Sequence, residues 1–345
     1  MIYTSGTEGR PKGVTYSRGA LEDGVHKYLA RLPMTADDVA LIAAPITRPM
    51  ALRTQLLPLL YAGGSVSLLP SFKVDTYVAA LTHGSAKTIL ALLPSALQAV
   101  LNHPRIDQCN FAGVRSVIVG GDHVAKELHE RAKQILGIEL TEQYGSSETG
   151  PITLNPPFGR KKPGSAGLPM YGVAVCVVND AGHHLPNGVS GNIVVQSEYA
   201  MSDYWNDTAL TRKTIKRGFV QTGDLGKFDE DGYLWVNGRK KDVIIRGGSN
   251  ISPGEVEFAL RRHVAVQDAS VVGVAHEDLG QEVRAFVTVK ESVVEQDLLD
   301  FARGQLAEYM VPARIYIVDS LPLKGAGKID RSRLRLRAET GCMDL

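Results

Sequence analysis

The first half of the chain alternates short apolar runs with segments whose apolar residues recur at helical spacing. The apolar runs predict buried strands at residues 39–44, 88–92, 114–119 and 138–143. The helical spacing predicts a helix that Ser17 caps, and further helices at residues 75–81, 95–101 and 123–136, the last closed by Gly137. Such alternation is typical of an α/β domain with a parallel sheet.

The uncharged run from Thr54 to Phe72 approaches the length of a membrane-spanning helix. It is interrupted by Pro58, by Gly63-Gly64 and by Pro70, which favour turns. We therefore expect buried strand and turn in this run, and we predict no transmembrane segment.

Residues 114–148 have the pattern of a strand–helix–strand unit. Such a unit makes its two strands parallel, so their carboxyl ends lie at the same edge of the sheet. The first strand ends in Gly120-Gly121 and the second in Tyr144-Gly145-Ser146-Ser147-Glu148. Because open α/β sheets bind ligands at that edge, we expect these turns to be neighbours in a functional site, although each alone could be an ordinary turn.

Beyond Pro163 the pattern becomes rich in short strands, which are predicted at residues 164–178, 191–195 and 232–236. The charged run 238–242 marks a domain boundary, although such runs are also typical of solvated turns. The remainder predicts a compact α+β module with strands at residues 242–245, 269–274, 283–289 and 314–318 and helices at residues 252–262 and 296–306. The first of these helices is expected to open with a capping box at Ser252-Pro253-Gly254-Glu255.

Composition limits the classes of function. The 345 residues are 44 % hydrophobic, enough for a sizeable core, and the formal net charge of +1 gives no electrostatic case for a nucleic-acid or anionic-membrane partner. The cysteines, Cys109, Cys176 and Cys342, are far apart and odd in number, as expected in a reducing compartment without a disulfide framework. We see no basic segment followed by an apolar one at the start, so we expect a cytoplasmic protein.

Candidate chemistry appears first at Tyr3-Thr4-Ser5-Gly6-Thr7-Glu8-Gly9-Arg10-Pro11-Lys12-Gly13-Val14. Glycines let backbone N–H groups turn toward an anion, hydroxyl groups add donors, and Lys12 supplies a positive charge. This composition is typical of a phosphate-binding loop, with an ordinary polar turn as the alternative. The spacing differs from that of the Walker motif G-x-x-x-x-G-K-[ST].

Five motifs together resemble the adenylate-forming, or AMP-binding, superfamily of acyl-CoA synthetases, peptide-synthetase adenylation domains and beetle luciferases. They cover nearly the whole chain, in the family's order, at residues 3–14, 144–148, 221–224, 238–257 and 322–328. The resemblance implies that a carboxylate attacks the α-phosphate of ATP, which gives an acyl-adenylate and pyrophosphate, and that a thiol, usually that of CoA, then displaces AMP. It therefore implies a fatty or aryl acid as substrate, with ATP, Mg²⁺ and CoA as cofactors.

The resemblance also implies roles for residues near the phosphates. The side chains and backbone groups that would hold the β- and γ-phosphates are Thr4, Ser5, Gly6, Thr7 and Lys12. Ser147 would reach the α-phosphate. Glu148 would bind Mg²⁺, for which a carboxylate is a suitable hard ligand, although a lone glutamate could equally be a surface residue.

The nucleoside would be held by a second group of residues. The resemblance places adenine between Tyr144 and Gly120-Gly121, and the ribose hydroxyls against Asp224. Arg239 would contact the ribose or a phosphate. Alone, Asp224 beside a glycine could be a turn residue; the joint occurrence of the motifs favours the functional interpretation.

Lys328 would bridge the substrate carboxylate and the α-phosphate during adenylation, with a solvated lysine as the alternative. In the family the small domain then rotates about a hinge, which corresponds here to Lys241, and withdraws this lysine. The rotation would bring the loop Gly247-Gly248-Ser249-Asn250 to the acyl-adenylate, so that Gly248 and Ser249 line the pantetheine channel.

The implied fold is α/β, α+β overall, in two domains. Residues 1–238 would form a partial large AMP-binding domain that contains a parallel sheet, with a β-rich subdomain from about residue 164. Residues 239–242 would be the hinge, and residues 243–345 a small mobile α+β domain. Family members carry a substantial block before the phosphate loop, so we expect the large domain to lack its first subdomain. A separate chain that supplies this part, or a homodimer, is an open alternative.

The sequence departs from the family pattern at several places, among them Ser147, which replaces the usual threonine and keeps the hydroxyl. Glu8 stands where threonine is commonest and puts a negative charge beside the phosphates. Gln221 stands where arginine is common before Thr-Gly-Asp. Residues 45–50 lack the usual aromatic or histidine gate of the acyl pocket, and Arg48 among them fits a surface arginine better than a contact to a polar substrate group.

The leading interpretation is an ATP-dependent acid–thiol ligase that forms acyl-CoA. One alternative is an adenylation domain that loads a carrier protein, although such a domain normally continues into a carrier domain and this sequence ends shortly after Lys328. Another is an inactive chain that binds a nucleotide or a partner.

Overall fold

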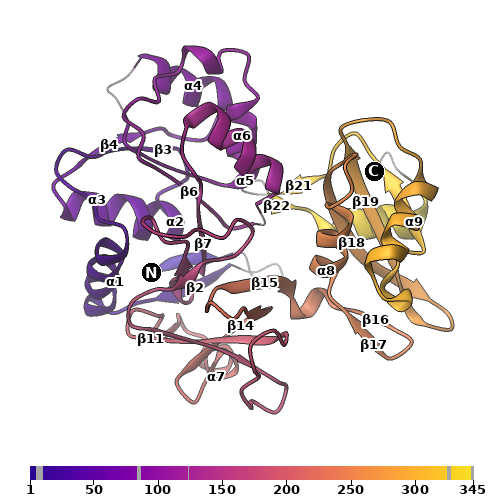
Figure 1. The fold of residues 1–345 in the computed structure, drawn as a ribbon. Coiled ribbons are helices and arrows are strands. Elements are labelled where there is room, and N and C mark those ends of the chain that lie inside the picture. Colours follow the sequence, from indigo (N-terminus) through magenta and orange to yellow (C-terminus); the bar gives the residue numbers. More distant parts are fainter. Residues whose placement is uncertain (5–10, 84–86, 123, 325–327, 343–345) are drawn as a thin grey trace. The chain divides into compact units, whose positions relative to one another are not determined.

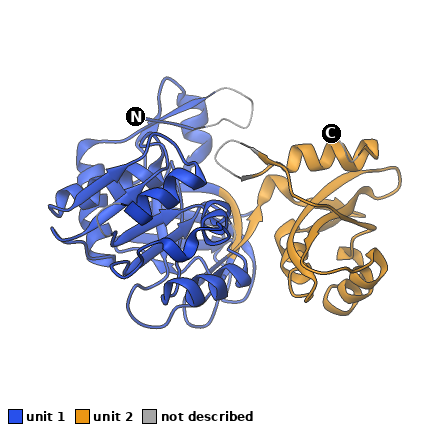
Figure 2. Cartoon of the chain, turned by 90° about the horizontal axis from the view of Figure 1, so that it is seen from above, with its two compact units in different colours: residues 1–222, 227–235 blue, residues 223–226, 236–345 orange. Residues whose placement is uncertain are grey.

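The computed structural model describes residues 1–4, 11–83, 87–122, 124–324 and 328–342. These form two compact units (Figure 2). Unit 1 contains Met1–Thr222 and Lys227–Trp235, and unit 2 contains Gly223–Gly226 and Val236–Leu345. The hinge expected at residues 239–242 stays a prediction.

A seven-stranded sheet is the framework of unit 1 (Figure 1). Its strands, in spatial order, are β4 (Ser65–Leu68), β3 (Val39–Ile42), β5 (Ile89–Leu92), β6 (Ser116–Gly120), β7 (Thr141–Ser146), β8 (Gly150–Leu154) and β9 (Leu168–Pro169). The first five are mutually parallel, and β8 and β9 are antiparallel. The predicted α/β class and the parallel pairing within residues 114–148 are therefore confirmed.

Helices cover both faces of this sheet. They are α1 (Arg18–Arg31), α2 (Pro49–Ala51), the π-helix η1 (Leu52–Leu56), α3 (Leu57–Tyr61), α4 (Val74–His83), α5 (Pro94–Leu101), the 3₁₀ turn η2 (Ile106–Gln108) and α6 (Lys126–Leu136). Leu41 and Leu90 pack toward α4, α5 and α6, whereas their neighbours Ala40 and Ile89 pack toward α1 and α3. Strand residues point alternately to opposite faces, so an uninterrupted apolar run fits a strand that is covered on both sides.

The predicted ends of two helices are confirmed. The Ser17 Oγ accepts a hydrogen bond from the Ala20 N–H at 3.0 Å and caps α1. Gly137 ends α6 in the left-handed region with φ of 72°. The prediction of buried strand and turn for residues 54–72 is wrong for residues 54–61, which are helical. Residues 62–72 do contain turns and a strand, although β4 is not buried. Pro58 lies at the start of α3, where helices tolerate proline.

The β-rich part of the chain forms two further sheets. One has the order β1 (Ile2–Thr4), β2 (Lys12–Thr15), β12 (Asp203–Tyr204). The other contains β10 (Val173–Val178), β11 (Gly191–Ser197), β13 (Ile215–Lys216), β14 (Phe219–Phe228) and β15 (Leu234–Arg239). Helix α7 (Thr208–Thr214) connects β12 to β13. The predicted strand at residues 164–178 is thus two strands, β9 and β10.

Unit 2 is an α+β module. Its elements are the 3₁₀ turn η3 (Lys240–Asp242), β16 (Ile244–Arg246), β17 (Ser249–Ile251), α8 (Pro253–Leu260), β18 (Val266–His276), β19 (Gly280–Val289), α9 (Glu295–Gln305), the 3₁₀ turn η4 (Glu308–Met310), β20 (Arg314–Ile317), β21 (Leu323–Lys324), β22 (Lys328–Ile329) and α10 (Arg331–Thr340). The predicted capping box is wrong. The Ser252 hydroxyl makes no cap on α8 and donates instead to the Asn237 carbonyl at 2.6 Å.

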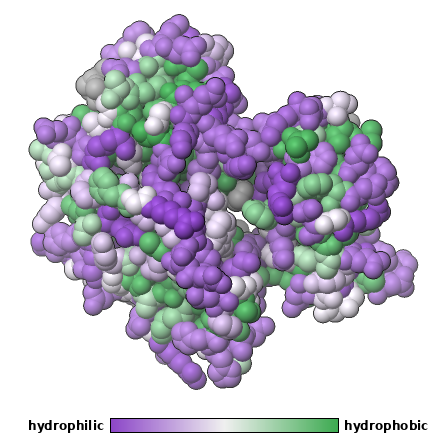
Figure 3. Space-filling view, in the orientation of Figure 1, coloured by the Kyte–Doolittle hydropathy of each residue, from purple (hydrophilic) through white to green (hydrophobic). Residues whose placement is uncertain are grey.

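Polar and apolar side chains are interspersed on the face drawn in Figure 3. Within the described residues, no helix combines the length and the hydropathy needed to cross a lipid bilayer. The three cysteines are free thiols.

A buried carboxylate fixes the edge of unit 1 where β3 begins. Asp38 accepts hydrogen bonds from the Arg115 Nε at 2.8 Å, the Thr88 hydroxyl at 2.7 Å and the Thr35 N–H at 2.8 Å. Burial acts to raise the pKa of Asp38, but these hydrogen bonds outweigh it and lower the pKa to about 2. The folded state therefore stabilises the ionised carboxylate.

We predict that Asp38→Asn lowers the free energy of unfolding by about 2 kcal/mol at neutral pH, because charged hydrogen bonds are lost. The folded pKa lies below the ordinary value of 3.8. The loss of unfolding free energy relative to wild type should therefore be complete above about pH 4. It should shrink as the pH falls toward the folded-state pKa of about 2. Urea unfolding at several pH values measures it. Glu22→Gln, at an exposed helix pair, is the control and should change little; a constant Asp38→Asn deficit at all pH values would contradict the account.

Candidate functional site

The carboxyl ends of β6 and β7 lie side by side in unit 1. Gly120 pairs with Gln143 in the parallel register, so Gly121 and Tyr144 follow on neighbouring strands. A Cβ atom at Gly120 would lie 2.4 Å from the Gln143 carbonyl oxygen, so only glycine fits there. Gly121 has a φ of 88°, which also favours glycine. The structure thus brings the three residues expected around adenine to one edge of the sheet.

Ser147 and Glu148 lie in the turn between β7 and β8. The turn is held from within, because the Ser146 N–H donates to the Thr149 Oγ1 at 3.2 Å and Thr149 is fully buried. Two residues outside the turn, Met201 and Tyr204, donate hydrogen bonds to Glu148. Its backbone carbonyl accepts from the Met201 N–H at 2.7 Å, and its Oε1 accepts from the Tyr204 hydroxyl at 2.8 Å.

The expected phosphate loop lies between β1 and β2, which pair in register from Ile2–Val14 to Thr4–Lys12. Thr4 and Lys12 therefore stand opposite each other at its two ends. Ser5, Gly6 and Thr7 lie outside the described residues. The Lys12 ammonium lies 5.8 Å from the centre of the Tyr204 ring.

Tyr204 thus contacts both Lys12, which is expected to bind phosphate, and Glu148, which is expected to bind Mg²⁺. Glu148 offers a single carboxylate, and the described residues contain no group of three or more His, Cys, Asp or Glu side chains that could hold a metal. Magnesium usually takes one or two protein carboxylates, substrate phosphates and water. The residues present therefore fit Mg²⁺ that arrives with ATP better than a resident metal.

A buried arginine that the sequence analysis did not single out lies behind this turn. Arg53, on the π-helix η1, is 4 % exposed, and its Nη2 donates to the Tyr199 carbonyl at 2.7 Å. Its guanidinium lies 4.6 Å from the centre of the Tyr16 ring. Burial raises the pKa of the Tyr16 hydroxyl to about 12. The positive charge of Arg53 acts to lower this pKa, and the negative charge of Glu148 acts to raise it. Gly150 has a φ of 71°, which favours glycine, and a Cβ there would lie 2.8 Å from the guanidinium.

Asp224 and Arg239 are brought together within unit 2. The Arg239 Nε lies 3.2 Å from the Asp224 Oδ1, and the Asp224 side chain is 9 % exposed. Gly223 before it has a φ of 76°, a conformation that favours glycine. The carboxylate is thus held within β14 beside a basic partner, and a carboxylate can accept hydrogen bonds from hydroxyl donors.

The Gly247-Gly248 turn of unit 2 borders an open surface depression of about 690 Å³. The depression is lined by Val243, Ile245, Gly247, Gly248, Asp278, Leu279, Gly280 and Gln281. The Gly247 N–H donates to the Leu279 carbonyl at 2.8 Å, and the Ile245 N–H donates to the Gln281 Oε1 at 2.8 Å. Ser249 follows in β17 but does not line the depression.

The two remaining predicted residues also lie in unit 2. Lys241 is exposed in η3. Lys328 begins β22, where its backbone pairs with that of Lys324, and its side chain lies outside the described part. The expected hinge and lysine roles stay predictions, as do the roles of the other site residues.

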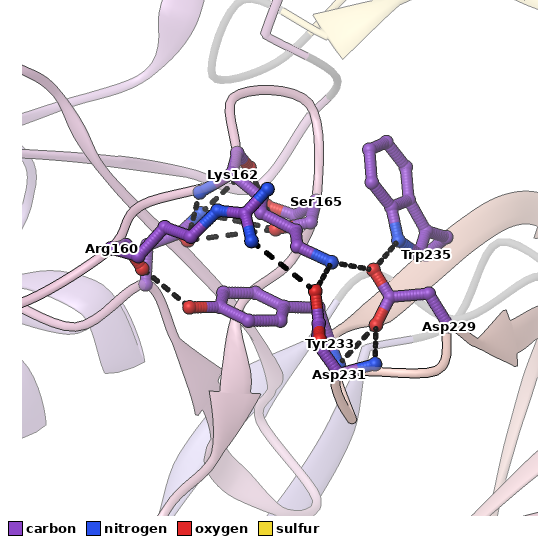
Figure 4. Close-up of polar contacts among 8 residues, drawn as sticks. Arg160, Lys162, Ser165, Asp229, Asp231, Tyr233 and Trp235 are labelled. Atoms are coloured by element: carbon purple, nitrogen blue, oxygen red, sulfur yellow. Dashed lines mark hydrogen bonds and ion pairs between the residues drawn. The ribbon is translucent and has the colours of Figure 1, made fainter.

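A polar cluster around Lys162 anchors the hairpin that leads into β15 (Figure 4). The Lys162 ammonium lies 2.6 Å from both the Asp229 Oδ2 and the Asp231 Oδ2, and 4.7 Å from the centre of the Tyr233 ring. The Trp235 Nε1–H also donates to Asp229 at 3.0 Å. Burial acts to raise the pKa of Asp229, but these donors outweigh it and lower the pKa to about 2. The cluster ties the segment before β9 to β15, whose last residue is Arg239.

Comparison with known proteins gives consistent relatives. Residues 1–205 match the family described as AMP-binding enzyme, and residues 255–328 match the AMP-binding enzyme C-terminal domain. The chain is 34 % identical to an indoleacetate–CoA ligase of Aromatoleum aromaticum over 97 % of its own length and 66 % of that protein. It is 33 % identical to a feruloyl-CoA synthase of an Amycolatopsis species, over 98 % of this chain and 69 % of the relative.

A solved structure agrees with these relatives. The ATP-bound crystal structure of MatB from Rhodopseudomonas palustris matches with a TM-score of 0.89 at 32 % identity, over 98 % of this chain and 67 % of MatB. The chain therefore spans about two thirds of the length of the proteins it matches. On its sequence, its fold and these relatives, the chain belongs to the AMP-binding enzyme family.

Proposed function

We propose that this chain carries the ATP-dependent acid–thiol ligase activity of its relatives. In the first step a substrate carboxylate oxygen forms a bond to the α-phosphorus of ATP, and the bond to pyrophosphate breaks. In the second step the sulfur of CoA forms a bond to the acyl carbon, and AMP leaves with the electrons of the carbon–oxygen bond. The thiol proton goes to solvent or base.

The observation that carries the proposal is the contact of Lys12 and Glu148 with the same side chain, Tyr204. Phosphoryl transfer needs positioning and charge stabilisation more than acid–base catalysis. Lys12 lies opposite Thr4 in the β1–β2 hairpin, here called the phosphate hairpin, and supplies a positive charge. Glu148, which contacts the same tyrosine, supplies a carboxylate suited to Mg²⁺. Mg²⁺ bound by Glu148 would neutralise charge on the phosphates.

Further roles in the proposal rest on the position of each residue in its own unit. In unit 1, Gly120, Gly121 and Tyr144 bind adenine, and Ser147 contacts the α-phosphate. In unit 2, the paired Asp224 and Arg239 bind the ribose. The Gly247-Gly248 turn, with Ser249, receives the thiol cofactor.

Substrate and location belong to the same proposal. The two relatives described act, by their names, on indoleacetate and ferulate, so we favour an aryl acid, with a fatty acid as the wider class. CoA is the proposed acceptor. Three free cysteines and the need for ATP and CoA agree with a cytoplasmic location.

The test is an assay of the wild-type chain with ATP, Mg²⁺ and a panel that contains an arylacetic acid, a cinnamic acid and a medium-chain fatty acid. We expect acid-dependent pyrophosphate release and a thioester that forms only when CoA is added. Binding of ATP without pyrophosphate release with any of the acids would contradict the ligase proposal. Thioester formation on a carrier protein but not on CoA would contradict the proposed acceptor.

Lys328→Ala separates the two half-reactions. We expect a loss of acyl-adenylate formation of at least about a hundredfold, because a charge that stabilises the transition state is removed. Thioester formation from supplied acyl-adenylate should be largely retained. Lys324→Ala, at the residue paired with Lys328 across the β21–β22 ladder, is the matched control and should retain both steps. Equal losses in both half-reactions of Lys328→Ala would rule out this division of labour.

A further inference from the structure

Tyr204 lies at a junction of three segments that are distant in the sequence. As part of β12 it pairs with Val14 of β2, and its neighbour Asp203 pairs with Thr15. Flanking bonds extend this pairing, since the Trp205 N–H donates to the Gly13 carbonyl at 2.7 Å and the Ser202 N–H to the Thr15 carbonyl at 2.9 Å. Tyr204 is therefore rigidly attached to the strand that carries Lys12.

The side chain of Tyr204 is buried, with 6 % of the residue exposed. It packs in an apolar cluster with Val14 and Met201, and its hydroxyl emerges from this cluster to donate to the Glu148 Oε1 at 2.8 Å. The phenol is the donor in this hydrogen bond, because a carboxylate oxygen can only accept. The bond occupies one carboxylate oxygen of Glu148 and leaves Oε2 for another partner.

We propose that Tyr204 is a positioning residue that couples the phosphate hairpin to the metal-binding carboxylate, an inference that rests on the function proposed above. The hydroxyl would hold one oxygen of Glu148 in place and leave the other available to a divalent cation. The ring supports the Lys12 ammonium through a cation–π contact. Neither contact alone would link the two groups.

The two contacts make separable predictions because they use different parts of the side chain. Tyr204→Phe removes the hydroxyl and keeps the ring, so the orientation of Glu148 is lost and the contact with Lys12 is kept. Tyr204→Leu removes both. Partners that orient a metal ligand typically contribute 10- to about 100-fold in metal affinity.

Tyr199 offers a matched control. It is fully buried, and its hydroxyl donates to the Pro151 carbonyl at 2.8 Å and not to Glu148. Tyr199→Phe therefore removes a buried phenol hydroxyl of the same kind without touching the carboxylate.

The experiment measures binding rather than turnover. Mn²⁺ replaces Mg²⁺, and its binding to the protein–ATP complex is followed by electron paramagnetic resonance without any carboxylic acid present. ATP binding is measured separately in EDTA by calorimetry. Thermal unfolding of each variant shows whether it is folded.

We expect Tyr204→Phe to weaken Mn²⁺ binding at least tenfold, with metal-free ATP affinity within twofold of wild type. Tyr204→Leu should weaken both Mn²⁺ binding and metal-free ATP binding. Tyr199→Phe should leave both unchanged. Unchanged Mn²⁺ binding in folded Tyr204→Phe would overturn this inference and leave the ligase proposal standing. Equal losses in Tyr204→Phe and Tyr199→Phe would also overturn it, since general destabilisation would then be the cause. Absence of Mn²⁺–ATP binding in the wild-type chain would overturn both proposals.

Discussion

The position of Glu148 depends on a segment more than fifty residues away in the sequence. Its carbonyl and its carboxylate are both hydrogen-bonded by residues 201–204, and Tyr204 of that segment pairs with β2. The turn after β7 and the hairpin β1–β2 are therefore parts of one hydrogen-bonded arrangement. A shift of either would break bonds to the other, each worth about 1–3 kcal/mol when a buried partner is left unpaired.

The parallel sheet supplies the rest of the geometry. Its β6 and β7 end at the same edge, where Gly120 avoids a side chain that would collide with Gln143 and Gly121 adopts a positive φ. Arg53 packs behind the β7–β8 turn, and Gly150 next to it has a φ of 71°, which favours glycine. Glycines thus shape the backbone both at the sheet edge and beside the turn that carries Glu148.

Local signals in the sequence predicted the local structure well. The apolar runs and the Ser17 and Gly137 signals predicted buried strands in a parallel sheet and two helix ends, since these depend on neighbouring residues. Tyr204 and Arg53 were missed because their contacts, to Glu148 and Tyr199, cross 56 and 146 residues of chain. The prediction of a capping box was wrong for the same reason, because the Ser252 hydroxyl donates to the carbonyl of Asn237, which lies outside the helix. The sequence did contain one sign of a buried polar cluster, because three polar residues interrupt an apolar stretch at Arg53, Thr54 and Gln55.

In the proposed reaction a carboxylate oxygen of the substrate attacks the α-phosphorus of ATP beside Lys12 and Glu148. Isotope transfer reveals which phosphorus atom is attacked. An acid labelled with ¹⁸O in its carboxylate is turned over with ATP, Mg²⁺ and CoA, and the products are analysed by mass spectrometry. The account predicts one ¹⁸O atom in AMP and none in pyrophosphate. Label in inorganic phosphate, with ADP as the nucleotide product, would place the attack at the γ-phosphorus and contradict it.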